Sequence, residues 1–294
     1  MRFLVLPSLL LALTAAAPRP VEQATIPNPD ERGNYLFRWT DENGDAREYL
    51  LILPDKISPQ IKVTLRRSDD GGYVYRYAIA NAKSAQRRLQ SCYVEVTMPT
   101  RIVGTPPGWE GLRPGAVAPR AAWFKVGFVD RVQGIPDGIT PGTAVVGFEL
   151  ASTNLPGVTE FTCLGDMNGL PSYLPRTVVR QVRSLLMIDD ELRVRAIGPI
   201  VTNSSASDIR EVVRRILRTY RPALESIRLS NAIAVRQALD QVGVDADRSL
   251  RELRASLTTL RDLLGEPASP WGRQVVGGLK ECIAYVLTKL PPPR

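Results

Sequence analysis

Short runs in which apolar and polar residues alternate occupy much of the chain between residues 34 and 200. Alternation with a period of two is typical of β-strands that bury one face. Turn residues separate the runs, and the Asn43-Gly44 pair is the strongest short signal for a hairpin. The alternating runs cover residues 35–39, 49–53, 61–65, 73–79, 92–96, 122–128, 143–150 and 158–164. Many short strands separated by turns predict an antiparallel, immunoglobulin-like β-sandwich over residues 34–200, with one or two more strands within 176–200.

The period changes to about 3.6 after Ser204, which is the repeat of an amphipathic helix. Ser207 is the expected N-cap of a first helix, which Pro222 limits or kinks. Ser269 and Pro270 are expected to start the last helix, with proline at its first position. Further helices are expected over residues 230–242 and 246–264. Amphipathic helices joined by short loops predict a small antiparallel helical bundle over residues 206–290. We therefore expect an α+β protein of two segregated domains.

Leucine recurs at spacings of three and four residues from Leu250 to Leu264. Such a repeat is found either in a helix that packs within its own chain or in an intermolecular coiled coil. A coiled coil usually sustains the pattern over three or four heptads, and this repeat lasts barely two. We therefore favour packing within the bundle.

The first residues have the pattern of a secretory signal peptide. Arg2 provides a positive start, residues 3–13 are almost all apolar, and Ala15 to Ala17 are small residues suited to cleavage. The alternatives are an uncleaved anchor and a buried N-terminal helix. We expect a signal peptide over residues 1–17, a flexible leader over 18–33, and a secreted or periplasmic mature chain. No later apolar run reaches the roughly 20 residues that a membrane-spanning helix needs, so no transmembrane segment is expected in the mature chain.

Composition excludes several kinds of chemistry. The 294 residues include no histidine, which removes Ser-His-Asp and Cys-His catalysis. Three widely spaced cysteines do not suit a zinc site, so no metal and no cofactor is indicated. The net charge is +8, but the basic residues are spread along the chain. This charge is a weak indication of anionic partners, and nucleic acid is the least expected of them in an exported protein.

The three cysteines are interpreted by compartment. In an oxidising space two of them are expected to form a disulfide, and Cys92 and Cys163 are the predicted pair because both lie in strand-like runs. Cys282 lies in the last expected helix. It is either a buried small apolar residue or a free thiol available to a partner, and burial is the commoner case.

The β-region resembles an uncharacterised domain of secreted bacterial proteins over about residues 60–165. The landmarks are Tyr75, Tyr77, Asn81, Gly108-Trp109, Trp123, Pro141-Gly142, Gly147-Phe148, Ser152 and Pro156-Gly157. The resemblance implies a bacterial envelope or extracellular protein. It implies no activity, and therefore no functional residues. The predicted helical region lies outside it.

Four residues are candidate ligand contacts. Trp109 follows Pro106-Pro107-Gly108 in an expected loop, where its ring would either stack on a ligand or cap the core, and we favour the cap. Arg210, Arg214 and Arg218 flank the apolar stripe of the first helix. They would either meet phosphate or an acidic polysaccharide, or form the solvated edge that amphipathic helices normally have.

The leading functional interpretation is an exported, non-catalytic binding or structural protein of the bacterial envelope or extracellular space. The partner would be a protein or an anionic or glycan surface. An alternative is a carboxylate-based hydrolase of envelope or extracellular polysaccharide, which needs two acidic residues brought together from distant strands. A third is adhesion to anionic lipid or polymer through the Arg-rich helix. We favour a protein that is not an enzyme.

Overall fold

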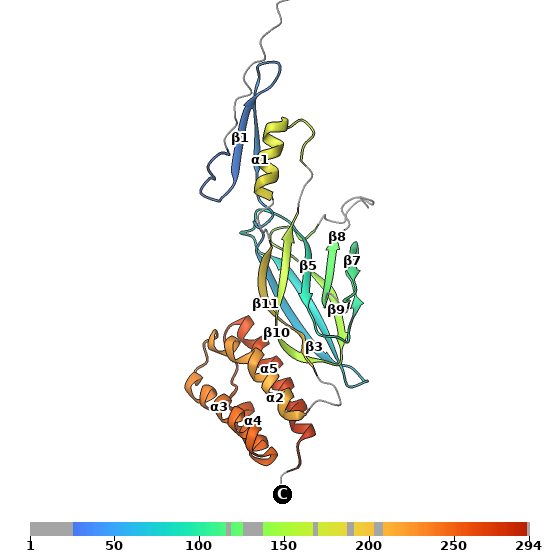
Figure 1. The fold of residues 1–294 in the computed structure, drawn as a ribbon, viewed down its shortest axis with the longest axis vertical. Coiled ribbons are helices and arrows are strands. Elements are labelled where there is room, and N and C mark those ends of the chain that lie inside the picture. Colours follow the sequence, from blue (N-terminus) through green and yellow to red (C-terminus); the bar gives the residue numbers. More distant parts are fainter. Residues whose placement is uncertain are drawn as a thin grey trace, which may run out of the picture.

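The protein is a mixed α+β molecule with antiparallel sheets. A computed structural model describes residues 26–115, 119–125, 138–166, 170–186, 191–202 and 208–292, which form eleven strands and five helices. Figure 1 shows an elongated molecule with a hairpin and helix α1 (Arg176–Leu186) at one end, the larger sheets in the middle and the C-terminal helices at the other end. The predicted signal peptide and residues 18–25 of the predicted leader lie outside the described residues.

Two sheets form the middle of the molecule. The first has the order β3 (Pro59–Arg67), β4 (Tyr73–Asn81), β9 (Thr143–Ser152) and β6 (Thr100–Gly104). The second has the order β11 (Leu192–Val201), β10 (Leu155–Gly165), β5 (Leu89–Glu95), β8 (Arg120–Lys125) and β7 (Trp109–Leu112). Their inner faces pack together, with the Tyr77 ring centred 4.9 Å from Phe161 and 6.2 Å from Trp123. The alternation of tyrosines in β4 thus places Tyr75 and Tyr77 in the core, where both are buried.

The hairpin consists of β1 (Tyr35–Thr40) and β2 (Ala46–Leu51). Its turn contains Gly44 at a φ of +86°, a conformation that glycine adopts without strain, as the Asn-Gly signal predicted. The hairpin packs against α1 (Arg176–Leu186) around a small apolar cluster of its own. The buried members of this cluster are Phe37, Leu51, Leu174, Val178, Val182 and Leu185.

Of the one or two further strands expected within residues 176–200 one is present, and helix α1, which was not expected, precedes it. The strand interpretation holds only for β11, and residues 176–186 are helical. Val178, Val182 and Leu185 are spaced by four and three residues, so a helix brings all three onto the face that meets the hairpin. Because α1 lies between β10 and β11, helices are not confined to the C-terminal part of the chain.

Three local expectations also need correction. Trp109 is the first residue of strand β7 and does not lie in a loop. Strand β6 was not expected at all. The first helix of the bundle is capped by Asp208, whose carboxylate accepts a hydrogen bond from the backbone N–H of Arg210 at 3.0 Å, and Ser207 lies outside the described residues.

The four expected C-terminal helices are present. They are α2 (Ile209–Glu225), α3 (Ala232–Arg248), α4 (Leu250–Leu263) and α5 (Pro270–Lys289). Pro222 lies inside α2, and Ser269 caps α5 through the N–H of Gly272, with Pro270 at its first position. The third expected helix begins later than predicted because the hydroxyl of Ser249 accepts from the first N–H groups of α4.

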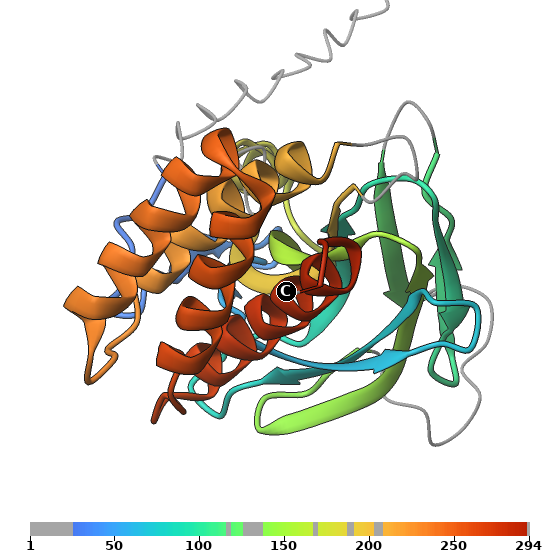
Figure 2. The same ribbon diagram turned by 90° about the horizontal axis from the view of Figure 1, so that it is seen from below.

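One apolar core extends from the two sheets into the helices. The same cluster contains Trp123 and Phe161 of the sheets, Ile216 of α2, Leu257 of α4 and Ile283 of α5. The leucine repeat of α4 is therefore buried within the chain, as its length predicted. Figure 2, viewed from below, shows the helices lying against one end of the sheets.

No helix among the described residues combines the length and the apolar character needed to cross a membrane.

Candidate functional site

A groove of about 750 Å³ lies between helix α2 and the outer face of the five-stranded sheet. Its floor comes from β5, β10 and β11, and residues of α2 form the facing wall. Helix α2 is fixed over the sheet by the hydroxyl of Thr219, which donates to the backbone carbonyl of Val158 at 2.9 Å. This volume is in the range of pockets that hold small molecules or short chain segments.

Five charged side chains line the groove. They are Glu95, Arg120, Glu160, Arg195 and Arg218. Arg120 lies 3.3 Å from the Glu95 carboxylate, and its guanidinium also lies 4.9 Å from the centre of the Tyr93 ring. Glu160 lies 3.8 Å from Arg193 at the edge of the groove. In the strand register, Arg120 lies opposite Glu95 and Arg195 lies opposite Glu160.

Arg195 and Arg218 are different, because neither forms an ion pair with any residue that the structure describes. Arg195 comes from β11 in the floor and Arg218 from α2 in the facing wall, so two cations without an ion pair among the described residues reach the same groove from facing sides. Guanidinium groups stay charged at any physiological pH and offer several donors in one plane, which suits carboxylate and phosphate oxygens. The groove therefore has the chemistry to accept an anionic group.

A second hollow of about 380 Å³ adjoins this groove along α2. It shares Ile200, Arg218 and Thr219 with the groove and adds Arg215. Arg215 precedes Arg218 by about one helical turn and is paired with Glu211 at 3.2 Å. The basic lining therefore continues along α2 beside the end of β11.

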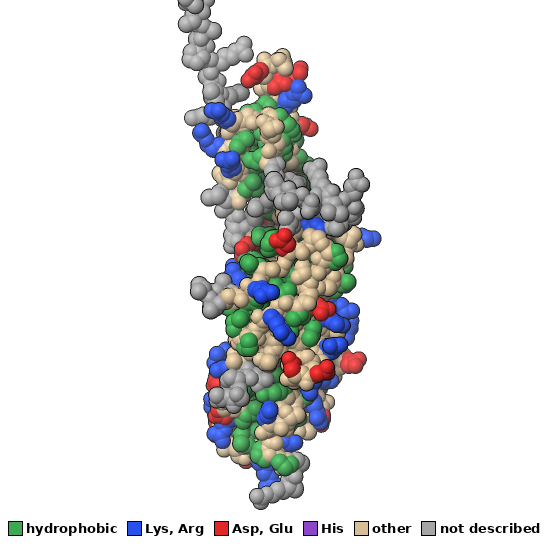
Figure 3. Space-filling view, turned by 90° about the vertical axis from the view of Figure 1, so that its right-hand side faces the viewer, with side chains coloured by type: hydrophobic (Ala, Val, Ile, Leu, Met, Phe, Trp, Pro, Cys, Tyr) green, Lys and Arg blue, Asp and Glu red, His purple; other side chains and the backbone are tan. Residues whose placement is uncertain are grey.

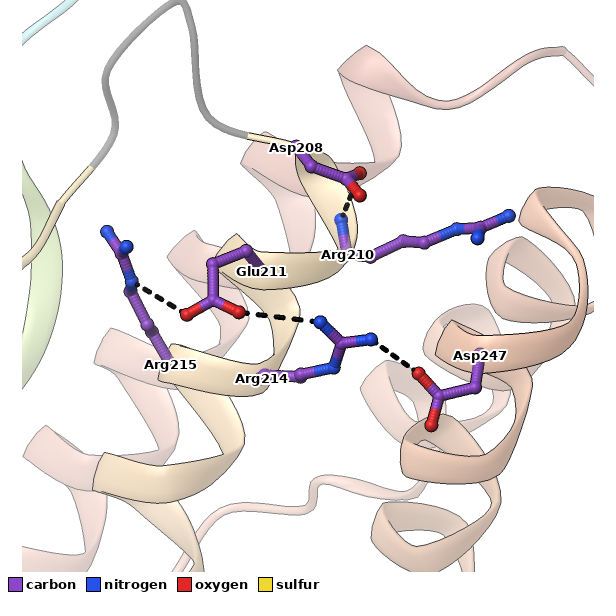
Figure 4. A network of polar contacts seen from close by, with 6 residues as sticks. All are labelled: Asp208, Arg210, Glu211, Arg214, Arg215 and Asp247. Carbon is purple, nitrogen blue, oxygen red and sulfur yellow. Dashed lines mark hydrogen bonds and ion pairs between the residues drawn. The ribbon is translucent and has the colours of Figure 1, made fainter.

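The structure separates the three arginines of α2 that the sequence grouped together. Only Arg218 lines the groove. Figure 4 shows Arg214 between Glu211 and Asp247, at 3.4 Å and 2.6 Å, so its charge is already compensated. In the same view the Arg210 side chain extends away from this ionic network, and only its backbone N–H is engaged, by Asp208. Arg214 and Arg210 lie about one and two turns before Arg218 on α2, and neither lines the groove.

Trp109 lies in the core and not on a binding surface. Its side chain is 8% exposed and packs edge-on against Phe148, with the ring centroids 5.1 Å apart. This is the capping arrangement that the sequence favoured over stacking on a ligand. The burial of the ring leaves no exposed face on which a sugar could stack.

The predicted disulfide is not present, because Cys92, Cys163 and Cys282 are all free, buried thiols. The structure does place Cys92 and Cys163 directly opposite each other on β5 and β10. Both side chains face the core, where a thiol packs as a small apolar group. Burial raises the pKa of the Cys163 thiol to about 12 and that of Cys92 well above its usual value. Cys282 is also buried and donates to the carbonyl of Pro156, so it is not available to a partner.

Charge on the remaining surface is dispersed. Figure 3 shows basic side chains spread along the length of one face, with acidic ones among them. Among the described residues no group of three or more Cys, Asp or Glu side chains is arranged to hold a metal ion. The dense acidic run at residues 189–191 lies mostly outside the described residues.

Sequence reasoning missed Arg195 and the two glutamates because their proximity depends on strand register. Val94 of β5 pairs with Phe161 of β10 in an antiparallel register. Glu95 follows Val94 and Glu160 precedes Phe161, so the register places the two glutamates opposite each other. The predicted pairing of Cys92 with Cys163 specifies this same register. Applied as a register, that prediction would have brought the two glutamates together on the opposite face of the sheet.

Comparisons with known proteins identify no family. No protein-family model matches the chain, and no curated protein matches it. A solved structure named BspA_C_WT is similar over 53% of this chain and 55% of its own length, with 10% sequence identity and a TM-score of 0.21. The match thus spans about half of that structure, and its TM-score is too low to support an argument about fold or function.

Proposed function

We propose that this protein is an exported, non-catalytic binding protein of the bacterial envelope or extracellular space, and that its groove accepts an anionic ligand. The observation that carries the proposal is the pair Arg195 and Arg218. They line one groove from a strand and a helix, and neither has an ion-pair partner among the described residues. An anionic group placed between them gains two charge-assisted interactions without breaking an existing ion pair.

The export part of the proposal is supported by the N-terminal sequence. A positive start, a short apolar segment and the small residues before Pro18 are typical of a secretory signal peptide. The resemblance of residues 60–165 to a domain of secreted bacterial proteins supports the same compartment. An immunoglobulin-like arrangement of the two sheets belongs to this proposal and is supported by their antiparallel strands and aromatic inner faces.

One observation favours a second candidate, a carboxylate-based hydrolase. Glu95 and Glu160 come from different strands and lie side by side in the groove, as paired catalytic carboxylates do. However, a general acid must be held protonated by an apolar or negative environment. Each of these carboxylates is about half exposed and has an arginine within 3.8 Å. The environment therefore favours binding over catalysis.

A thermal-shift screen of the mature chain tests the binding function. The panel contains anionic glycans, wall fragments, phosphate esters and anionic lipid headgroups. A ligand at a hundredfold excess over its dissociation constant stabilises the folded state by about 2.7 kcal/mol, which gives a measurable rise in Tm. We expect that rise for the native protein and its loss in the Arg195→Ala/Arg218→Ala variant.

Arg210→Ala is the matched control, because Arg210 lies on α2 but does not line the groove. It removes one positive charge, where the double variant removes two, and should leave the shift intact. A shift that persists in the double variant, or that disappears equally in Arg210→Ala, would place binding elsewhere. Release of reducing sugar ends by the native protein, abolished by Glu95→Gln, would instead establish the hydrolase.

A further inference from the structure

Four charged residues form a row across the outer face of the five-stranded sheet. Arg120 of β8 pairs in register with Glu95 of β5, and Glu160 of β10 pairs with Arg195 of β11. The β5–β10 register places Glu95 and Glu160 next to each other between them. The floor of the groove therefore has two negative charges in the centre and a positive charge at each end.

Like charges directly opposite each other on neighbouring strands destabilise a sheet. Their arginine neighbours compensate them only in part. The Glu160–Arg193 separation is 3.8 Å, and the carboxyl side chains of Glu95 and Glu160 are 53% and 52% exposed. Such exposed pairs contribute little net free energy. The two glutamates therefore present an accessible centre of negative charge in a groove that otherwise attracts anions.

The geometry points to a zwitterionic ligand, a peptide-like chain in which an ammonium group lies beside carboxylates. The ammonium group would lie over Glu95 and Glu160, and a carboxylate would lie between Arg195 and Arg218. A purely anionic ligand would place negative charge over the two glutamates, which is repulsive. This inference rests on the proposed function and adds which charges the ligand carries and in what order.

The test compares two peptides by isothermal titration calorimetry with the mature protein. The first is acetyl-Glu-Lys-Glu-amide, and the second is the same peptide with an acetylated lysine side chain. Acetylation removes the ammonium group and makes the peptide more negative. A zwitterion site should bind the acetylated peptide about fivefold more weakly, whereas a site that attracts only anions should bind it equally well or more tightly. The sign of the difference therefore decides between the two.

Two sets of variants locate the effect. Glu95→Gln/Glu160→Gln should abolish the preference for the lysine peptide, and both substitutions are at exposed positions that should not disturb folding. Glu149→Gln is the matched control, since Glu149 forms a cross-strand ion pair with Arg76 on the other sheet, at 3.0 Å. It should leave the preference unchanged.

The failure of this inference differs from the failure of the proposed function. Equal or tighter binding of the acetylated peptide, lost in the Arg195→Ala/Arg218→Ala variant, would overturn the zwitterionic ligand and leave the anion-accepting groove intact. If neither peptide binds but another anion of the panel gives a groove-dependent shift, the zwitterionic ligand is again overturned and the anion-accepting groove is kept. Absence of any groove-dependent binding would overturn both.

Discussion

The phenolic hydroxyl of Tyr220 donates a hydrogen bond to the backbone carbonyl of Pro156 at 3.0 Å. Tyr220 belongs to α2 and Pro156 to β10, and both are buried where the helices meet the sheets. The thiol of Cys282 in α5 lies 3.0 Å from the same carbonyl oxygen. One backbone carbonyl of the sheet is thus the common acceptor for side chains of two helices, and it joins α2 and α5 to β10 at the same place.

Because the core is continuous through this junction, we expect the sheets and helices to unfold together. Urea unfolding followed by far-ultraviolet circular dichroism and by tryptophan fluorescence should give one coincident transition. Tyr220→Phe should lower the free energy of unfolding by about 1 kcal/mol, through loss of one buried hydrogen bond. Two separate transitions, with only the helical signal responding to Tyr220→Phe, would show that the bundle is an independent domain.

Two neighbouring glycines of α5 should respond in opposite ways to alanine. A β-carbon at Gly278 would collide with the Tyr220 hydroxyl, while a β-carbon at the exposed Gly277 would meet no atom within 4 Å. We expect Gly278→Ala to destabilise the protein by about 1–3 kcal/mol, because the buried ring cannot move without disturbing its neighbours. Gly277→Ala should stabilise it by up to about 1 kcal/mol, because alanine favours a helix interior.

The urea midpoints of these two variants give the comparison directly. Helix propensity alone predicts the same gain at both positions. Equal midpoints would therefore mean that Tyr220 does not occupy the space beside Gly278, and that the packing of α2 against α5 differs from this structure.

The sequence predicts elements whose signals are local. The alternation of Tyr75 and Tyr77 indicates their strand and its buried face, and Ser269-Pro270 indicates the start of α5. Residues 176–186 contain two adjacent valines, a residue type common in strands. The helical repeat of apolar residues in this segment is too short to outweigh that signal. What selects the helix is contact with Phe37 and Leu51, more than a hundred residues earlier in the chain. Such a contact cannot be read from the segment itself.

The groove was less accessible to sequence reasoning than the fold. Arg218 was predicted from the amphipathic pattern of α2, but that pattern equally suggested Arg210 and Arg214. The position of the sheet along α2 decides among them, because the groove is lined by the part of the helix from Arg218 to Ala223. The charge row depends on the register of three strand pairs, and no local pattern of residues specifies a register between distant strands.

The three thiols should be unreactive in the folded protein and fully available after unfolding. All three are buried, and burial raises their pKa values, so little thiolate exists at pH 8. We expect iodoacetamide to label none of them in native buffer and all three in guanidinium chloride without reductant, counted by mass spectrometry. A single labelled thiol in guanidinium chloride would contradict this structure and indicate a Cys92–Cys163 disulfide.

Buried thiols and phenols should also make the protein sensitive to alkali. Burial raises the pKa of Cys163 from 9.0 to about 12, and it raises the pKa of Tyr73 from 10.0 to about 12. A group whose pKa is higher in the folded state stabilises that state fully below its unfolded pKa, and the contribution disappears as pH rises toward the folded value. Stability should therefore fall between about pH 9 and pH 12, by about 1.4 kcal/mol per pH unit for each fully buried group.

Urea midpoints measured from pH 7 to pH 11 test this. Because of the net charge, the direction in which stability changes with pH distinguishes two explanations. The chain carries +8 at neutral pH, so deprotonation first reduces its net charge and relieves self-repulsion. If overall repulsion dominated, stability would rise with pH over this range instead of falling. Cys163→Ala removes one of the titrating groups. The fall of its unfolding free energy with pH in the alkaline range should therefore be less steep than that of the native protein, by the amount that one proton contributes. An unchanged slope would mean that the Cys163 thiol ionises equally easily in the folded and unfolded chains, and is therefore not buried in the core.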